Sequence, residues 1–131
     1  MRVLALDYGS ARCGCAISDP TGTLATPIDV VERPTTRRGL ARLADLVRER
    51  EVDRVVVGLP VTLRGTDSDQ TREARAFADT LAERVAVPIE LYDERFTTAI
   101  AARTAGAATA EDSRAAAVLL EDWLARQEAA S

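Results

Sequence analysis

Short apolar runs alternate with longer amphipathic stretches along the chain, and this alternation predicts a mixed α/β fold. Residues Arg2–Asp7 and Arg12–Ser18 are predicted to form two buried strands. The turn sequence DPTGT at Asp19–Thr23 follows, so a third strand at Leu24–Val31 is expected to pair antiparallel with the second. The run RVVVG at Arg54–Gly58 is almost wholly apolar, which is typical of a strand covered on both faces.

Apolar residues at helical spacing mark the helices. Leu40, Leu43 and Val47 form one such stripe, which predicts a helix over Thr36–Arg50. A similar stripe, which includes Leu119, lies in the last predicted helix. The remaining predicted elements are a helix at Gln70–Val85, a strand at Val87–Tyr92, a short helix near Thr98–Thr104 and a longer helix from about Glu111 to Arg126.

The predicted order of elements is therefore β-β-β-α-β-α-β-α-α. A β-meander joined to βαβ units makes a mixed five-stranded sheet with helices packed on its faces. This order matches the ribonuclease H-like arrangement, although several other α/β folds share it. At 131 residues the chain has the length of one domain, so we expect residues 1–131 to form a single domain.

The composition excludes several kinds of catalytic chemistry. The chain has no histidine, and all 17 of its basic residues are arginine, so it offers neither a histidine base nor a lysine for Schiff-base or P-loop chemistry. Its net charge of −4 argues against a broad basic surface but leaves room for a local basic patch. No membrane helix or signal-peptide pattern is present, so we expect a cytoplasmic protein without a membrane partner.

Two cysteines, Cys13 and Cys15, lie two residues apart in a predicted strand, so their side chains share one face. A disulfide between them would be strained, and the chain lacks the further ligands of a zinc or iron–sulfur site. We interpret both as small buried apolar residues, with a redox role as the alternative.

Acidic residues stand at the ends of three predicted elements. Asp7 closes the first buried strand, where a lone carboxylate is costly unless a cation or hydrogen bonds compensate it. Asp93 and Glu94 directly follow the last strand. Asp112 begins the final helix, one turn before its apolar stripe, so it points along the face that packs on the sheet. These acids could meet at one edge of the sheet.

Convergence of these acids would require a cation. Their mutual repulsion otherwise raises at least one pKa. All-oxygen ligands in a chain without histidine point to Mg²⁺ or Mn²⁺ rather than Zn²⁺. Two such ions about 3.5–4 Å apart activate a water and stabilise the leaving oxygen in phosphodiester hydrolysis.

Each acid also has a purely structural interpretation. Thr109-x-x-Asp112 is a capping-box pattern, in which Asp112 satisfies a backbone N–H at the start of the helix. Asp93 and Glu94 are equally compatible with a solvated loop in which Glu94 pairs with Arg95. Both interpretations stay open at this point.

Glycines support a site near the first strand. Gly9 and Gly14 lie beside Asp7 and let the backbone approach a ligand or a neighbouring strand. The polar loop around Arg64 and Gly65, after the fourth strand, is either a grip on a phosphate backbone or a plain surface loop.

The chain resembles the YqgF/RuvX family in four motifs, which follow the family's order and spacing over about residues 3–124: LALDYGSARCGCAISDP, VVVGLPVTLRGT, YDERFTT and DSRAAAVLLEDWL. Members of this bacterial family are ribonuclease H-like proteins described as pre-16S rRNA nucleases and, earlier, as Holliday junction resolvases. The resemblance implies a metal-dependent endonuclease that uses Mg²⁺ or Mn²⁺ and trims the 5′ end of 16S rRNA precursors in the cytoplasm.

The resemblance also implies roles for single residues. The family's catalytic and metal-binding acids fall on Asp7, Glu94 and Asp112, with Asp93 beside them as a further metal ligand. Arg12 and Arg95 match basic positions of the family that contact phosphate. The residues expected to contact the substrate are Gly9, Ser10, Arg12, Arg64 and Arg95.

The chain departs from the family pattern where lysines are common. Ala11 stands before the arginine of the first motif, and the stretch before the helix acid reads TAGAATAED. Both differences remove positive charge near the expected substrate path. The lost charge favours one alternative, a protein that binds ribosomal precursor particles without cutting. The other alternative is a resolvase acting on branched DNA, because nothing in the residues separates the two nucleic acids. In each case we expect a monomer or weak homodimer. The first motif also resembles a phosphate loop of actin-like ATPases, but those proteins need two such domains.

Overall fold

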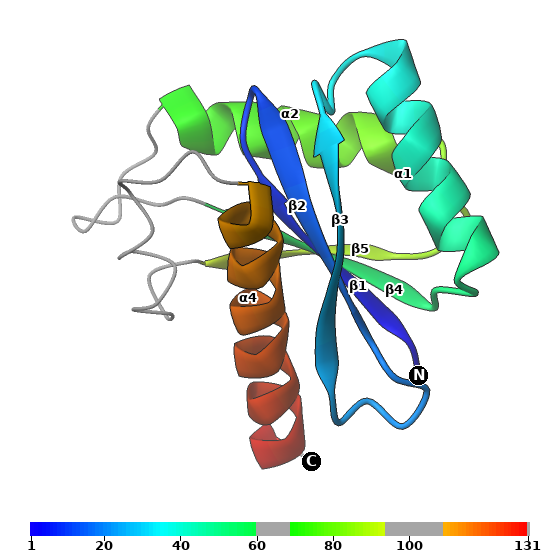
Figure 1. Ribbon diagram of the computed structural model, residues 1–131, viewed down its shortest axis with the longest axis vertical. Coiled ribbons are helices and arrows are strands. Elements are labelled where there is room, and N and C mark those ends of the chain that lie inside the picture. The colour runs from blue at the N-terminus through cyan, green and yellow to red at the C-terminus, as the bar shows by residue number, and fades with distance from the viewer. Residues whose placement is uncertain (60–68, 94–108, 131) are drawn as a thin grey trace.

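The computed structural model describes residues 1–59, 69–93 and 109–130, and residues 60–68, 94–108 and 131 lie outside the described part. Five strands and three helices make up this part (Figure 1). The strands are β1 (Val3–Tyr8), β2 (Arg12–Ser18), β3 (Ala25–Glu32), β4 (Arg54–Leu59) and β5 (Ile89–Asp93). The helices are α1 (Arg37–Glu49), α2 (Asp69–Ala82) and α4 (Thr109–Ala130).

The strands form one mixed sheet in the order β3-β2-β1-β4-β5. β1, β2 and β3 pair antiparallel as a meander, whereas β4 and β5 run parallel to β1. The predicted five-stranded mixed α/β sheet is therefore confirmed. The helical crossovers that parallel pairing requires are α1, between β3 and β4, and α2, between β4 and β5.

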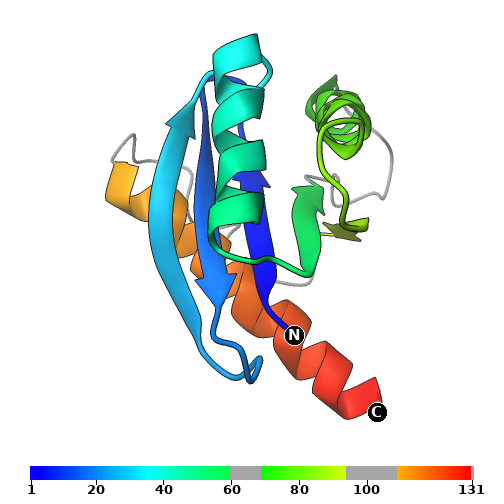
Figure 2. The same ribbon diagram turned by 90° about the vertical axis from the view of Figure 1, so that its right-hand side faces the viewer.

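Helices cover both faces of the sheet (Figure 2). α1 and α2 lie on one face, and α4 lies on the other. Side chains of β1 alternate between the two cores: Leu4 and Leu6 belong to the core under α1 and α2, whereas Val3 and Ala5 belong to the core under α4. Burial of β1 on both faces explains why its sequence is an apolar run rather than an alternating pattern.

The element boundaries differ from the predicted ones by a few residues at most. α2 ends at Ala82 rather than Val85, because the N–H groups of Glu83 and Arg84 turn back to carbonyls three residues earlier. The short helix predicted near Thr98–Thr104 lies outside the described residues. Cys13 and Cys15 are unbridged and fully buried in the core under α1 and α2, as the prediction of small buried residues requires.

The predicted turn between β2 and β3 is organised by Asp19. Its carboxylate accepts the N–H groups of Thr23 and Leu24, each at 2.8 Å. These hydrogen bonds hold the pKa of the Asp19 carboxyl well below its ordinary value. The turn therefore has a fixed shape at the end of the sheet where β2 finishes.

The start of α1 is held tightly against the preceding segment. Thr36 caps the helix, with its Oγ1 accepting the N–H of Gly39 at 3.1 Å. A Cβ at Gly39 would overlap the carbonyl oxygen of Arg33 and lie 2.8 Å from Cα of Pro34. Only glycine allows this close approach, so the position of residues 33–36 is fixed relative to the helix.

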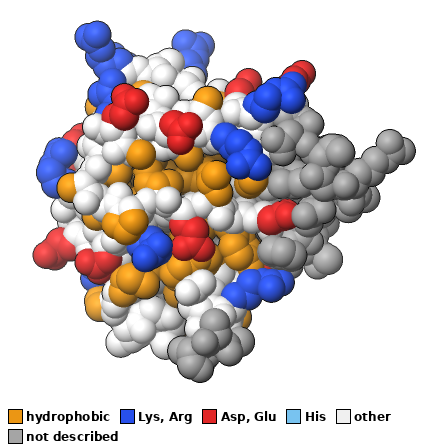
Figure 3. All heavy atoms as spheres, turned by 180° about the vertical axis from the view of Figure 1, so that it is seen from behind, with side chains coloured by type: hydrophobic (Ala, Val, Ile, Leu, Met, Phe, Trp, Pro, Cys, Tyr) orange, Lys and Arg blue, Asp and Glu red, His pale blue; other side chains and the backbone are white. Residues whose placement is uncertain are grey.

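The two edge strands differ in how they are protected. β3 carries Pro27, and the side chain of Asp29 accepts the N–H of Val30 at 2.8 Å, so part of this edge cannot pair with another strand. β5 leaves Leu91 37% exposed. In the view from behind, apolar side chains reach the surface in a band across the middle of the molecule (Figure 3).

Candidate functional site

Asp7 is the buried acid of the sheet. It lies near the carboxyl end of β1 and is 2% exposed. Alternation along β1 places its side chain on the same face as Val3 and Ala5, which α4 covers. A carboxylate removed from water in this way is stable only when hydrogen bonds or a cation compensate the lost hydration.

Glycines lie on both sides of Asp7 in the sheet. Gly14 of β2 is its direct partner across the antiparallel pair. Leu6 pairs with Val57 of β4, so the register continued by one residue brings Asp7 beside Gly58. Because paired residues point to the same face, neither neighbouring strand places a side chain next to the carboxylate of Asp7. The two strands beside Asp7 therefore contribute only backbone atoms to this row of the sheet.

The ends of other elements lie on the same side of the molecule as the end of β1. Figure 1 shows the end of β4, the end of β5 and the starts of α2 and α4 gathered there. α4 runs antiparallel to β1, since Trp123 and Leu124 lie beside Met1 and Val3 at the other end. From Trp123 back to Asp112 the helix rises about 16 Å, and β1 rises about 13 Å from Val3 to Asp7. The first turn of α4 is therefore level with Asp7.

The structure describes the backbone of Asp112 but not its side chain, and it does not describe Glu94. Asp112 lies in the first turn of α4, on the line of the buried residues Ala116, Leu119 and Trp123, but its side chain lies outside the described part. Both interpretations of Asp112, as a metal ligand and as a helix cap, therefore stay open. Glu94 also lies outside the described residues, so its role stays a prediction.

Asp93 ends β5, where it pairs with Leu59 of β4. Tyr92 is level with Gly58 and therefore lies in the same row as Asp7. Asp93 is one residue further, and strand alternation points its side chain to the opposite face, which Leu59 shares. Of the described residues of β5, it is therefore Tyr92 and not Asp93 that faces the same side as Asp7.

The donor set fits a hard divalent cation. Among the described residues, no group of three or more Asp, Glu, His or Cys side chains is close enough to hold a metal ion. Asp7 is the described member of the predicted set that is buried on the α4 face, and the other two predicted catalytic acids have no described side chain. Carboxylate oxygens are the ligands that Mg²⁺ and Mn²⁺ prefer.

The turn between β1 and β2 contains three of the residues expected to contact substrate. A Cβ at Gly9 would lie 2.8 Å from the carbonyl oxygen of Arg12, so a close approach of the backbone requires glycine there. Ser10 is exposed, and Arg12 is half-buried at the start of β2. Arg64 and Arg95 lie outside the described residues.

Sequence reasoning missed a polar connection between β5 and α4. The hydroxyl of Tyr92 donates to Asp122, which also accepts the Nε–H of Arg126 at 3.1 Å. Burial and the neighbouring Asp122 carboxylate raise the pKa of Tyr92 well above its ordinary value. The signal available in the sequence was the alternation of Tyr92 with its neighbours, which assigns it to a covered face.

A second hydrogen bond joins the same two elements. The indole N–H of Trp123 donates to Glu90 at 2.9 Å, and the other carboxylate oxygen of Glu90 pairs with Arg54 of β4 at 3.2 Å. Together with Tyr92 and Asp122, these contacts fix the register between β5 and α4. β5, which ends just before Glu94 in the sequence, and α4, which includes Asp112, are thereby held to one another.

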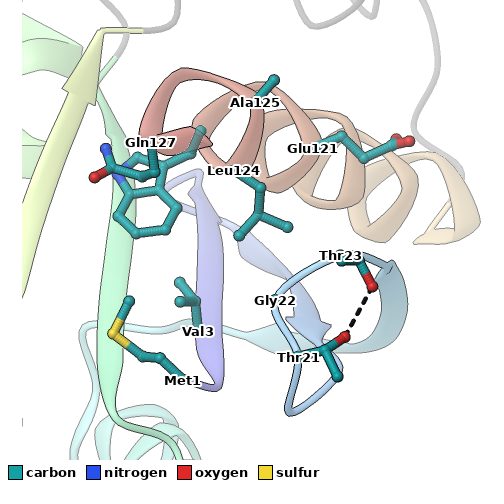
Figure 4. A pocket seen from close by; sticks show the side chains of 10 residues that line it. Met1, Val3, Thr21, Gly22, Thr23, Glu121, Leu124, Ala125 and Gln127 are labelled. Atoms are coloured by element: carbon teal, nitrogen blue, oxygen red, sulfur yellow. Dashed lines mark hydrogen bonds between the residues drawn. The ribbon is translucent and has the colours of Figure 1, made fainter. Parts of the chain in front are cut away.

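A pocket of about 600 Å³ opens at the opposite end of the molecule (Figure 4). It lies between the carboxyl half of α4 and the turn after β2, and its lining includes Met1, Val3, Thr21, Thr23 and Leu124. Val3 is at the start of β1 and Asp7 near its end. This pocket is therefore separate from the candidate site.

Comparison with known sequences gives a consistent match. A family model described as "RuvX: Holliday junction resolvase" matches residues 1–126. A protein of Mycobacterium leprae (strain Br4923) named "Putative pre-16S rRNA nuclease" is 46% identical over 139 residues, which cover 99% of this chain and 76% of that protein. A protein of Maridesulfovibrio salexigens with the same name is 40% identical over 134 residues, which cover 96% of this chain and 99% of that protein.

Comparison with solved structures confirms the fold. The structure of Thermus thermophilus RuvC superposes with a TM-score of 0.62 at 15% identity, over 98% of this chain and 97% of that one. The same protein in complex with a Holliday junction substrate gives a TM-score of 0.61 at 18% identity, over 97% and 96% of the two chains. The predicted ribonuclease H-like arrangement is therefore correct. Within the described residues, no helix has the length and apolarity needed to cross a membrane.

Proposed function

Because this chain belongs to the RuvX family, we propose that it is a metal-dependent endonuclease that hydrolyses phosphodiester bonds and matures the 5′ end of pre-16S rRNA. The observation that carries this proposal is Asp7, an acid 2% exposed in a row of the sheet where both neighbouring strands present glycine. Removing a carboxylate from water is costly, and a bound cation would compensate that cost.

In this proposal Asp7, Glu94 and Asp112 hold the ions, whereas Asp93, at the end of β5, has its side chain on the opposite face of the sheet. Mg²⁺ or Mn²⁺ held there would activate a water and stabilise the leaving oxygen of the phosphodiester. Asp7 contributes a ligand whose position is fixed by hydrogen-bonded strands on both sides, so little reorganisation is needed when the substrate arrives.

The remaining residues bind and orient the substrate. The glycine row beside Asp7 leaves the space in which a scissile phosphate can approach. Arg12, half-buried at the start of β2, supplies positive charge next to the turn at Gly9 and Ser10. Arg64 and Arg95 complete the predicted set of substrate contacts. We place the activity in the cytoplasm, where precursor rRNA is available.

The test is cleavage of a labelled pre-16S rRNA fragment with and without Mn²⁺ or Mg²⁺. Asp7→Asn is expected to reduce the metal-dependent rate at least about 100-fold, since it removes a charged ligand. Asp79→Asn on α2 makes the same chemical change at an exposed residue and is expected to leave the rate unchanged. Cutting that Asp7→Asn does not reduce, or that needs no metal, would contradict the proposal.

Two further outcomes assign the alternatives. A four-way DNA junction is included because the matching family model is described as a resolvase. Metal-dependent cutting of the junction but not of the RNA would make the protein a resolvase. Binding of the RNA without cutting under any metal condition would make it a binding protein for ribosomal precursors.

A further inference from the structure

Three exposed arginines lie together in one short segment that leads from β3 into α1, at the end of the sheet where β1 finishes. We define the arginine segment as residues 33–38, with the sequence RPTTRR. Arg33, Arg37 and Arg38 are exposed, and none of them forms an ion pair with a residue that the structure describes. The segment itself contains no acid, although the chain as a whole has a net charge of −4.

Several other described arginines pair with acids. Arg42 pairs with Asp29 at 3.1 Å and with Glu49 at 3.6 Å. Arg48, Arg54, Arg72 and Arg126 likewise form ion pairs, with Asp45, Glu90, Asp69 and Asp122 respectively. The arginine segment therefore concentrates positive charge that is available to an external anion. Arginine side chains project from the end of the molecule where α1 begins (Figure 3).

The segment is fixed relative to the turn that follows Asp7. The N–H of Arg33 donates to the carbonyl of Ala11 in the β1–β2 turn at 2.9 Å. The carbonyl of Arg33 in turn accepts the hydroxyl of Thr36 at 2.7 Å. With the close approach of Gly39, these contacts hold the backbone of Arg33 in a left-handed conformation (φ 48°). The guanidinium groups therefore project from a rigid base.

The register of the sheet gives the distance from the site. Asp7 pairs with Gly14, and Gly14 pairs with Val30 of β3. Two strand spacings in one direction and three residues in the other put Cα of Arg33 about 14 Å from Cα of Asp7.

We propose that the arginine segment binds the phosphate backbone of the nucleic acid to one side of the scissile phosphate. This inference rests on the proposed nuclease function and extends it to a surface that the sequence motifs did not include. Arginine is suited to this role because its planar guanidinium group makes two parallel hydrogen bonds to a phosphate. Such contacts fix the register of the substrate and carry no base specificity.

Two of these arginines lie where positive charge lowers the stability of the fold. Arg37 and Arg38 occupy the first turn of α1, which contains no acid. Cations at this end of a helix are opposed by the helix dipole. Arg37→Gln/Arg38→Gln is therefore expected to leave Tm unchanged or raise it by about 1–3 °C. If the two arginines serve binding, their replacement leaves Tm unchanged or raises it. If they serve the fold, their replacement lowers Tm.

The test measures binding of a pre-16S rRNA fragment and of a four-way DNA junction in EDTA, across a series of salt concentrations. Arg37→Gln/Arg38→Gln is expected to weaken binding about fivefold or more and to lower the slope of log Kd against log salt by about 1.5. The matched control is Arg50→Gln/Arg84→Gln, which makes the same charge change at two exposed arginines away from the segment. Arg37→Lys/Arg38→Lys keeps the charge and is expected to restore the salt slope.

The outcomes separate this inference from the function on which it rests. Loss of affinity for both nucleic acids in the segment variant alone supports a contact with the phosphate backbone, and loss for the RNA alone supports a contact specific to RNA. Equal behaviour of the segment variant and the control pair overturns the inference, while metal-dependent cutting by the unaltered protein still supports the nuclease. A fall in Tm of the segment variant assigns the arginines a structural role. Failure of the unaltered protein to bind either nucleic acid overturns both proposals.

Discussion

Asp7 of β1 and Gly14 of β2 lie directly opposite each other in the antiparallel pair, on the face of the sheet that α4 covers. The residue directly across from Asp7 therefore carries no side chain. Gly58 continues the same row on β4. The other central positions on this face, Val3, Ala5, Ala16 and Val56, carry side chains and are fully buried.

Adding a side chain at Gly14 is expected to block the site without removing any acid. Gly14→Val places an isopropyl group next to the carboxylate of Asp7, so we expect at least about a tenfold loss of metal-dependent cutting and a smaller rise of Tm on adding Mn²⁺. Cys13→Val is the matched control, because Cys13 is the preceding residue of β2 and faces the other core. A Gly14→Val variant that cuts and responds to Mn²⁺ like the unaltered protein would show that this space is not used.

Replacing Gly39 by alanine has two opposite effects on the free energy of unfolding. Replacing a helical glycine by alanine gains about 1 kcal/mol in helix propensity. A Cβ here would meet the backbone of Arg33 and Pro34, which cannot move as a flexible side chain can, and such overpacking costs about 1–3 kcal/mol. We expect Gly39→Ala to lower the free energy of unfolding measured in urea, because the overlap with backbone exceeds the gain.

The control for this change is Ala41→Gly, at an exposed position of the same helix. It is expected to lower the free energy of unfolding by about 1 kcal/mol from propensity alone. A Gly39→Ala variant more stable than the unaltered protein would mean that residues 33–36 can shift away from α1.

The order of the elements could be predicted because each depends on a local pattern. Apolar runs identified β1 and β4, and helical spacing of Leu40, Leu43 and Val47 identified α1. The mixed character of the sheet then followed from the connection rules of the meander and the βαβ units, whereas the strand order β3-β2-β1-β4-β5 comes from the structure. The fold was thus accessible from patterns that span fewer than about 20 residues.

The site was less accessible because it depends on contacts between distant segments. The sequence indicated that Asp7 closes a buried strand, but only the register shows that Gly14 and Gly58 flank it. Similarly, Asp93 follows the family motif, yet strand alternation turns it to the face opposite Asp7. The arginine segment looked like an ordinary connection, since nothing local indicates that Arg33 is hydrogen-bonded to the turn at Ala11.

The hydrogen bond between Tyr92 and Asp122 is expected to stabilise the docking of α4 on β5. A double-mutant cycle with Tyr92→Phe and Asp122→Asn is expected to give a coupling of about 1–2 kcal/mol in urea unfolding, as for a partly buried hydrogen bond to a carboxylate. The cycle cancels the separate contribution of Arg126, which also pairs with Asp122. A coupling near zero would show that the two residues contribute independently to the stability of the fold.

Alkaline pH is expected to destabilise the protein through Tyr8. Its ring stacks on Phe77 with centroids 4.6 Å apart, and its hydroxyl donates to Glu73 at 3.3 Å. Burial, together with the charge of Glu73, raises the pKa of Tyr8 from 10.0 to about 12. Because the pKa is higher in the folded than in the unfolded state, the protonated hydroxyl stabilises the fold fully below about pH 10, and this stabilisation is lost between about pH 10 and 12.

Absorbance of tyrosinate checks this directly, since the chain has only 2 tyrosines, Tyr8 and Tyr92. In the folded protein both should titrate above the ordinary tyrosine pKa, and in urea both should titrate near about 10. Tyr8→Phe should remove the transition near 12 and make the free energy of unfolding less dependent on pH in this range. The contrary result would be a Tyr8 transition at the same pH in the folded and the unfolded protein. In that case the hydroxyl of Tyr8 contributes no pH-dependent stability.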